Sequence, residues 1–98
     1  MSIQVVFKNL DRSDSLVQFI EKQSAKIMKF VKPSARITYY IEKLSNGLKV
    51  SLQLDEYGKH FEAQAINSNA YAGIDGALKR MNRQLREGHS LVTDKIHR

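Results

Sequence analysis

Basic side chains recur at helical spacing in two separate segments of the chain. In the first segment, an i, i+4, i+7 pattern places Lys22, Lys26 and Lys29 along one line of a helix. In the second, the run KRMNRQLR holds no acid and four bases: Lys79, Arg80, Arg83 and Arg86. Like charges one turn apart destabilise a helix by roughly 0.2–0.5 kcal/mol per pair. Such rows are therefore typical of a surface that binds an anion.

The chemistry of these side chains favours RNA as that anion. A net charge of +6 on 98 residues fits either a nucleic acid or an anionic lipid surface, and lysines can also serve solubility alone. Arginine is more selective, because its planar fork holds two phosphate oxygens and stacks on unpaired bases. We predict that the two rows bind RNA through seven residues: Lys22, Lys26, Lys29, Lys79, Arg80, Arg83 and Arg86.

The sequence carries no recognisable catalytic or metal-binding motif. It has no cysteine, so disulfides, thiolate nucleophiles and cysteine-based metal sites are excluded. His60, His89 and His97 are scattered, and neither HExxH nor a phosphate-binding loop occurs. No serine stands in a recognisable order with a histidine and an acid. We expect a protein that is not an enzyme and needs no cofactor, metal or small-molecule substrate.

No stretch approaches the roughly 18 apolar residues that a membrane span needs, and the N-terminus lacks the basic and apolar regions of a signal peptide. We therefore expect a cytoplasmic protein without a membrane partner.

Two amphipathic helices are needed to carry the basic rows. Ser13 is suited to cap the first, which should run to about Val31, because Pro33 blocks its continuation. Asn69 should cap the second, which should end near Gly88. Each helix has an apolar arc beside its basic row, so one side of each helix should face a core.

Apolar residues alternate along four short segments, which predicts four half-buried strands at residues 3–8, 35–43, 48–54 and 61–65. Asn46-Gly47 predicts a tight antiparallel hairpin, and Gly58 a second turn. Since each strand has one apolar face, both helices must cover the same face of the sheet. We predict an α+β two-layer sandwich of order β-α-β-β-β-α, with a single domain at residues 1–90 and a short flexible tail at 91–98.

Two further motifs have competing interpretations. Gly73-Ile74-Asp75-Gly76 matches the GXXG string of KH domains, but there the motif joins two helices, whereas here it lies inside one. The glycines could instead permit close packing, or the close approach of an RNA backbone. Of Tyr39 and Tyr40, only one can face outward, so we expect Tyr40 to be an ordinary strand residue rather than part of a base-stacking platform.

The stretch NAYAGIDGALKRMNRQLREG resembles the closing helix of the ribosome hibernation-promoting factor and ribosome-associated inhibitor family. The resemblance extends over residues 1–90 through the opening strand, the helix start Ser13-Asp14-Ser15-Leu16 and the phrase IEKLSNGLKVSLQL. It departs at Asn69, where the family usually has an acid, and at Gly73 and Gly76, where larger residues are usual. The short tail is similar to that of the short hibernation-promoting type.

This resemblance implies a fold like that of double-stranded-RNA-binding domains and a place in the decoding channel of the small ribosomal subunit. There the protein would exclude tRNA and mRNA, inhibit translation in stationary phase or stress, and promote dimers of idle ribosomes with a separate small modulation factor. The seven basic residues would face rRNA, and the protein would be a monomer off the ribosome. Two alternatives remain: a generic double-stranded RNA binder, and a protein-interaction module regulating transcription through the outer sheet face.

Overall fold

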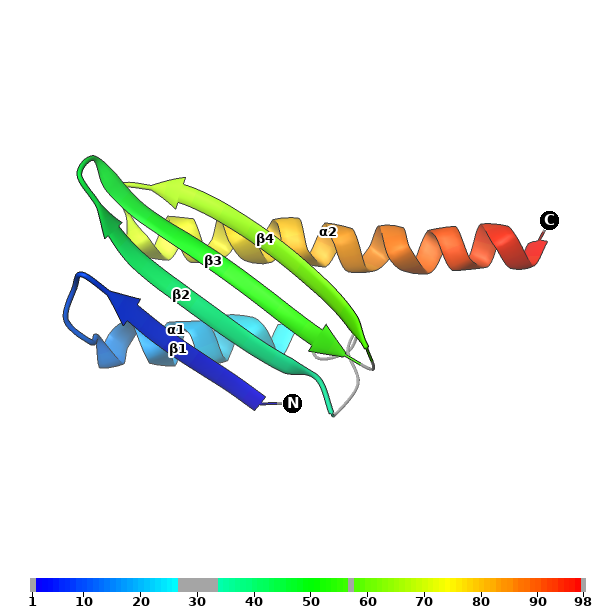
Figure 1. Ribbon diagram of the computed structural model, residues 1–98, viewed down its shortest axis with the longest axis horizontal. Coiled ribbons are helices and arrows are strands. Elements are labelled where there is room, and N and C mark those ends of the chain that lie inside the picture. The colour runs from blue at the N-terminus through cyan, green and yellow to red at the C-terminus, as the bar shows by residue number, and fades with distance from the viewer. Residues whose placement is uncertain (1, 27–33, 57, 98) are drawn as a thin grey trace.

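The computed structural model describes residues 2–26, 34–56 and 58–97, with side chains as far as residue 87. Both helices lie on the same side of a four-stranded sheet, as Figure 1 shows. The element order confirms the predicted β-α-β-β-β-α sandwich. The elements are β1 (Ser2–Lys8), α1 (Asp14–Ser24), β2 (Arg36–Leu44), β3 (Gly47–Glu56), β4 (Lys59–Asn67) and α2 (Ala70–His97).

The sheet has the strand order β1-β2-β3-β4 and is mixed in direction. β1 is parallel to β2, and the connection between these two strands contains α1, as a parallel pair requires a crossover. The hairpins β2–β3 and β3–β4 are antiparallel, as predicted. The first turns at Ser45-Asn46, one position before the predicted Asn46-Gly47, because Gly47 already pairs with Leu44; the second turns at Gly58. β4 is therefore an edge strand, with one row of backbone groups free of strand partners.

The core lies between the sheet and the two helices. Every second strand residue faces it, so that rows such as Tyr39, Leu52 and Ala63 cross the sheet in register and are buried. The helices close the core from the other side. Among the side chains described, α1 contributes two buried apolar residues and α2 five: Leu16, Ile20, Ile74, Ala77, Leu78, Met81 and Leu85.

Helix α1 begins where the sequence predicted and ends earlier. The Ser13 hydroxyl oxygen accepts a hydrogen bond from the Leu16 amide at 3.3 Å, which confirms the cap. The α-helix stops at Ser24, so the predicted end near Val31 is wrong. At Ala25 and Lys26 the chain tightens into a 3₁₀ turn, which is common at helix ends. The apolar residues that suggested a longer helix, at 27–31, lie outside the described residues.

Ser24 and Tyr39 form the buried polar contact that joins the end of α1 to the centre of the sheet. Their hydroxyl oxygens are 2.6 Å apart, and both residues are fully buried. Burial raises the pKa of Tyr39 to about 12, against a smaller lowering by the hydrogen bond to Ser24. The phenol therefore stays neutral at physiological pH, and each hydroxyl satisfies the other.

Helix α2 begins as predicted and continues beyond the predicted end. The side-chain oxygen of Asn69 accepts hydrogen bonds from the amides of Tyr71 (2.9 Å) and Ala72 (3.3 Å). The helix runs to His97, so the predicted end near Gly88 is wrong. A glycine inside a helix costs only up to about 1 kcal/mol, and it ends a helix only when it takes a left-handed conformation. The predicted flexibility of residues 91–98, most of which are helical, stays a prediction.

Gly73 and Gly76 allow α2 to lie close against the sheet. A Cβ atom at Gly73 would be 3.0 Å from Val50 Cγ2, and one at Gly76 would be 3.3 Å from Ala65 Cβ. Both glycines face the sheet from the interior of one helix, which is not the arrangement of a KH loop. The close-packing interpretation is therefore the one that the structure supports.

We predict that Gly73→Ala destabilises the protein by about 1–3 kcal/mol, because overpacking against the stiff, buried Val50 outweighs the gain in helix propensity. Gly76→Ala is the matched control, since it brings the same gain in helix propensity while its new Cβ atom would approach Ala65 less closely than the Cβ at position 73 approaches Val50. Chemical denaturation of both variants checks the ranking, and a Gly73→Ala protein at least as stable as Gly76→Ala would contradict it.

A second prediction concerns the hydroxyl pair. Tyr39→Phe should lower the free energy of unfolding by about 1–3 kcal/mol, because it leaves the Ser24 hydroxyl buried without a partner. The double variant Ser24→Ala/Tyr39→Phe should recover part of that loss, since neither polar group then remains. A double-mutant cycle of denaturation midpoints measures the coupling; strictly additive effects would show that the contact contributes little.

Candidate nucleic-acid interface

Helices α1 and α2 lie side by side and contact each other through aromatic rings. The ring centroids of Phe19 and Tyr71 are 4.9 Å apart, and the rings meet edge to face at 79°. Further along both helices, a groove of about 300 Å³ separates their outer sides. We call it the interhelical groove; among the described residues its lining is Gln23, Lys26, Asp75, Leu78, Lys79 and Asn82.

The interhelical groove brings the two basic rows together. Lys26 of the first row and Lys79 of the second are both exposed and line it, Lys26 from the 3₁₀ turn at the end of α1 and Lys79 from α2. Lys22 is exposed one turn before Lys26. Arg83 and Arg86 follow Lys79 at i+4 and i+7 and are exposed on the same line of α2. Lys29, the last member of the first row, lies outside the described residues.

The Arg80 side chain does not lie on the same line of α2 as the other basic residues of its row. Its guanidinium donates a hydrogen bond to the main-chain oxygen of Gln64, on the free edge of β4. Gln84 makes the same kind of contact one turn later, with its Nε2 2.6 Å from the main-chain oxygen of Glu62. Arg80 thus lies along the sheet edge, roughly 100° around α2 from Lys79, and helps to hold the helix against β4.

One of the remaining cations, Arg83, forms an ion pair with an acid. Arg83 Nε is 2.9 Å from Glu87 Oε1, and both side chains are mostly exposed. Such a surface pair contributes about 0–1 kcal/mol and leaves the other guanidinium donors of Arg83 available. Within the described side chains, no ion pair involves Lys22, Lys26, Lys79 or Arg86.

The groove also contains two acceptors that the sequence-based search did not find. Asp75 lines the groove together with Lys26 and Lys79, one helical turn before Lys79 on α2, yet no ion pair to it forms in the described part of the chain. The side-chain oxygen of Asn82 is buried and has no hydrogen-bond partner among these residues. The spacing of Tyr71, Asp75, Leu78 and Asn82, at i, i+4, i+7 and i+11, was the available signal: it marks one line of α2 beside the apolar arc.

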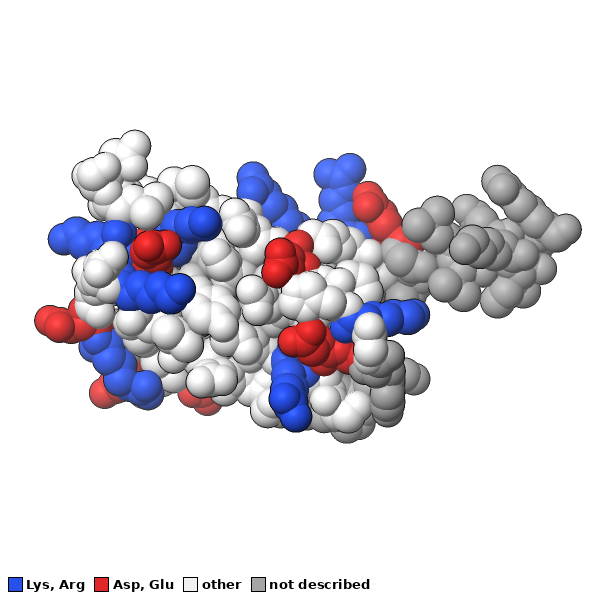
Figure 2. Space-filling model, viewed as in Figure 1, with Lys and Arg blue, Asp and Glu red and all other residues white. Residues whose placement is uncertain are grey.

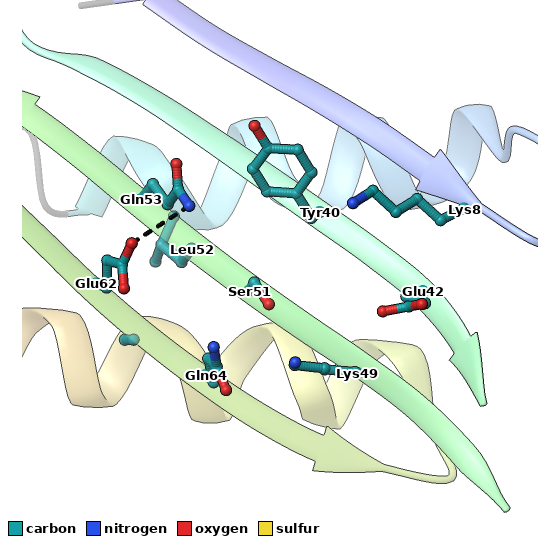
Figure 3. A pocket seen from close by; sticks show the side chains of 10 residues that line it. Lys8, Tyr40, Glu42, Lys49, Ser51, Leu52, Gln53, Glu62 and Gln64 are labelled. Atoms are coloured by element: carbon teal, nitrogen blue, oxygen red, sulfur yellow. Dashed lines mark hydrogen bonds between the residues drawn. The ribbon is translucent and has the colours of Figure 1, made fainter.

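The open face of the sheet has a different electrostatic character. Basic and acidic side chains are intermixed there and separated by uncharged surface, as Figure 2 shows. In the row Lys8, Glu42 and Lys49, which pair in register across three strands, the charges alternate. These residues line a shallow hollow of about 370 Å³, seen in Figure 3. This mixture of signs makes the open face a poor surface for a polyanion.

Tyr40 lies on that open face, whereas Tyr39 is buried, as expected from strand alternation. The Lys8 ammonium is 4.9 Å from the centroid of the Tyr40 ring, where a cation is attracted to the aromatic face (Figure 3). The ring therefore already has a partner within the protein, in keeping with the expectation of an ordinary strand residue.

His60 is held between two carboxylates on the same face. Its Nδ1 is 2.6 Å from Asp55 Oδ1, and its Nε2 is 2.9 Å from Glu62 Oε1. The hydrogen bond to Asp55 and then that to Glu62 raise the pKa of His60. The two carboxylates contact opposite ring nitrogens and so do not converge on a point that one metal ion could occupy.

Within the described residues, no group of three or more histidine or carboxylate side chains is arranged so that it could hold a metal ion. No helix in that part of the chain is both long and apolar enough to cross a membrane.

Solved structures with a similar fold include two proteins that are each less than 25% identical in sequence to this chain. The N-terminal domain of Protein Y from Thermus thermophilus has a TM-score of 0.79 and 22% identity, covering 89% of this chain and 98% of that domain. A ribosomal subunit interface protein from Coxiella burnetii has a TM-score of 0.80 and 20% identity, covering 92% of this chain and 99% of that one. A search of curated proteins finds no match.

A family model gives the assignment that these distant structural matches do not. It matches residues 3–90, almost the whole of the 98-residue chain, and describes a sigma 54 modulation protein / S30EA ribosomal protein. The match agrees with the resemblance seen in the closing helix. The chain belongs to this sigma 54 modulation / S30EA ribosomal protein family.

Proposed function

We propose that this protein is a ribosome-associated factor that binds rRNA of the small subunit through the outer side of its two helices. One observation carries the proposal: Lys26, in the turn that follows α1, and Lys79 of α2 line the same groove, so the two basic rows form one surface. The mixed charges of the opposite face support the same choice of side. Membership of a family described as ribosomal supports the ribosome as the source of the RNA.

The mechanism that we propose is occlusion without catalysis. Lysine and arginine side chains displace counterions from the phosphate backbone, and the rigid sandwich fits a folded RNA surface by shape. Bound in the decoding channel, the protein excludes tRNA and mRNA and thereby inhibits translation. The resemblance to hibernation factors supports this location, and it supports a role in stationary phase, when idle ribosomes dimerise with the help of a separate small modulation factor.

The proposal also covers the organisation of the chain. Residues 1–90 form the ribosome-binding domain, and residues 91–98 are a tail that this binding does not need. The protein acts in the cytoplasm as a monomer until it binds. It requires no cofactor, since charge and shape are sufficient for occlusion.

The basic surface predicts a specific loss of binding. Lys26→Glu/Lys79→Glu should weaken co-sedimentation with purified small subunits by roughly a hundredfold, because two attractive charges become repulsive. Arg80 is left intact because it holds α2 against β4.

The matched control is Lys8→Glu/Lys49→Glu, which changes the net charge equally but on the open sheet face. It should retain most of the binding. Equal losses in the two double variants would mean that only net charge matters, and undiminished binding of the helix variant would refute the proposed surface.

Salt dependence gives a further prediction. The logarithm of the wild-type binding constant should fall linearly with the logarithm of salt concentration, and the slope for the helix double variant should be shallower by about 2, one for each lost phosphate contact. Affinity measurements between low and physiological salt check this. Binding that is insensitive to salt would favour a protein-interaction module, and equally tight binding to a plain RNA duplex would favour a generic duplex binder.

A further inference from the structure

The interhelical groove contains the wrong kind of polar group for phosphate. Phosphate oxygens are acceptors, and so are the Asp75 carboxylate and the side-chain oxygen of Asn82. Asp75 repels a phosphate, whereas Lys26 and Lys79, which line the same groove, attract one. The buried oxygen of Asn82 has no partner among the described residues, and leaving such an atom unsatisfied is costly. The groove therefore fits a ligand that brings hydrogen-bond donors and is attached to phosphates.

The groove has an apolar wall and lies near an exposed aromatic ring, which suits the flat face of a base. Leu78, which is only 7% exposed, gives it an aliphatic wall. Tyr71 lies one helical turn before Asp75 on the same line of α2 and is 43% exposed, although it contacts Phe19. A volume of about 300 Å³ is at the lower end of the range for small-molecule sites. An exposed aromatic ring beside unpaired polar groups is a common arrangement for recognising unstacked bases.

Among the bases, guanine matches these acceptors best. Its Watson–Crick edge carries two adjacent donors, N1–H and the N2 amino group, and a carboxylate can accept from both. Adenine, cytosine and uracil each place a single donor beside an acceptor, which Asp75 would repel. The phosphates on the two sides of an extruded nucleotide would then lie near Lys26 and Lys79.

We infer that the interhelical groove binds an unpaired guanine of the RNA, with Asp75 accepting hydrogen bonds from its Watson–Crick edge and Asn82 accepting from its amino group. The inference rests on the proposed function, because it takes the RNA to be present on this surface. Without this site, the surface would attract any phosphate backbone. The site makes binding depend on the identity of one base.

The variant Asp75→Asn separates base recognition from general electrostatics, because the two predict opposite changes in affinity for the small subunit. Removing a negative charge from a cationic surface should strengthen binding of a polyanion. Loss of a bidentate contact to guanine should instead weaken binding to purified small subunits by about tenfold. Glu42→Gln, which removes one acid from the open sheet face, is the control and should bind as the wild type does.

Chemical probing identifies the base. Kethoxal modifies N1 and N2 of unpaired guanines, so the wild-type protein should protect at least one guanine of the small-subunit RNA. Asp75→Asn and Asp75→Ala should lose that protection at protein concentrations high enough to saturate the subunits. Thermal unfolding of both variants should be close to that of the wild type, since Asp75 has no partner within the described residues.

The outcomes distinguish the two proposals. Wild-type protein that fails to bind small subunits overturns the proposed function itself. Wild-type binding combined with Asp75→Asn binding that is equal or tighter overturns the guanine site alone. Weaker binding without any Asp75-dependent protection of a guanine also overturns it, and then favours a cationic side chain of a ribosomal protein as the occupant of the groove.

Discussion

The alternation of apolar and polar residues along all four strands is the constraint on which the rest of the structure depends. It gives the sheet one apolar face, and burying that face requires both helices to pack in the same layer. Rows such as Tyr39, Leu52 and Ala63 carry this alternation across the sheet. Glycine at positions 73 and 76 lets α2 approach closely enough for its apolar arc to reach the core. The outward sides of the two helices then become one continuous surface, and the basic rows share it for that reason.

The elements could be predicted from the sequence because their signals are local. Asn46-Gly47 defines a hairpin within a few residues, and Ser13 and Asn69 satisfy the first amides of their helices directly. Helix ends are a different matter. Apolar periodicity continues past Ser24, yet α1 stops at that residue. A glycine stands at position 88, yet α2 continues beyond it. Where a helix ends depends on the packing of the next turn against other elements, as with the buried bond of Ser24 to Tyr39, and no local pattern contains that information.

The candidate site was predictable to a similar extent. Helical spacing predicts which cations share a line, and it placed Lys79, Arg83 and Arg86 together correctly. It cannot predict that the guanidinium of Arg80 bonds to the edge of β4, because that carbonyl is free only on account of the strand order. Asp75 and Asn82 were missed for a related reason. A search for rows of like charge passes over an isolated acid, and the groove that gives the acid its importance exists only where α1 and α2 pack together.

Asp75 would give the surface a selectivity for RNA sequence that the cations alone do not provide. Phosphate contacts fix position and supply affinity, but they are the same for every RNA sequence, so specificity has to come from groups that reach the bases. An unpaired carboxylate in a groove that two lysines also line penalises a phosphate at that point, and a donor-bearing group offsets the penalty. In a regular duplex the donors of the Watson–Crick edges are already paired. A surface of this kind should therefore discriminate against plain duplexes and in favour of folded RNA that presents an extruded base, which agrees with occlusion of one defined site better than with general RNA binding.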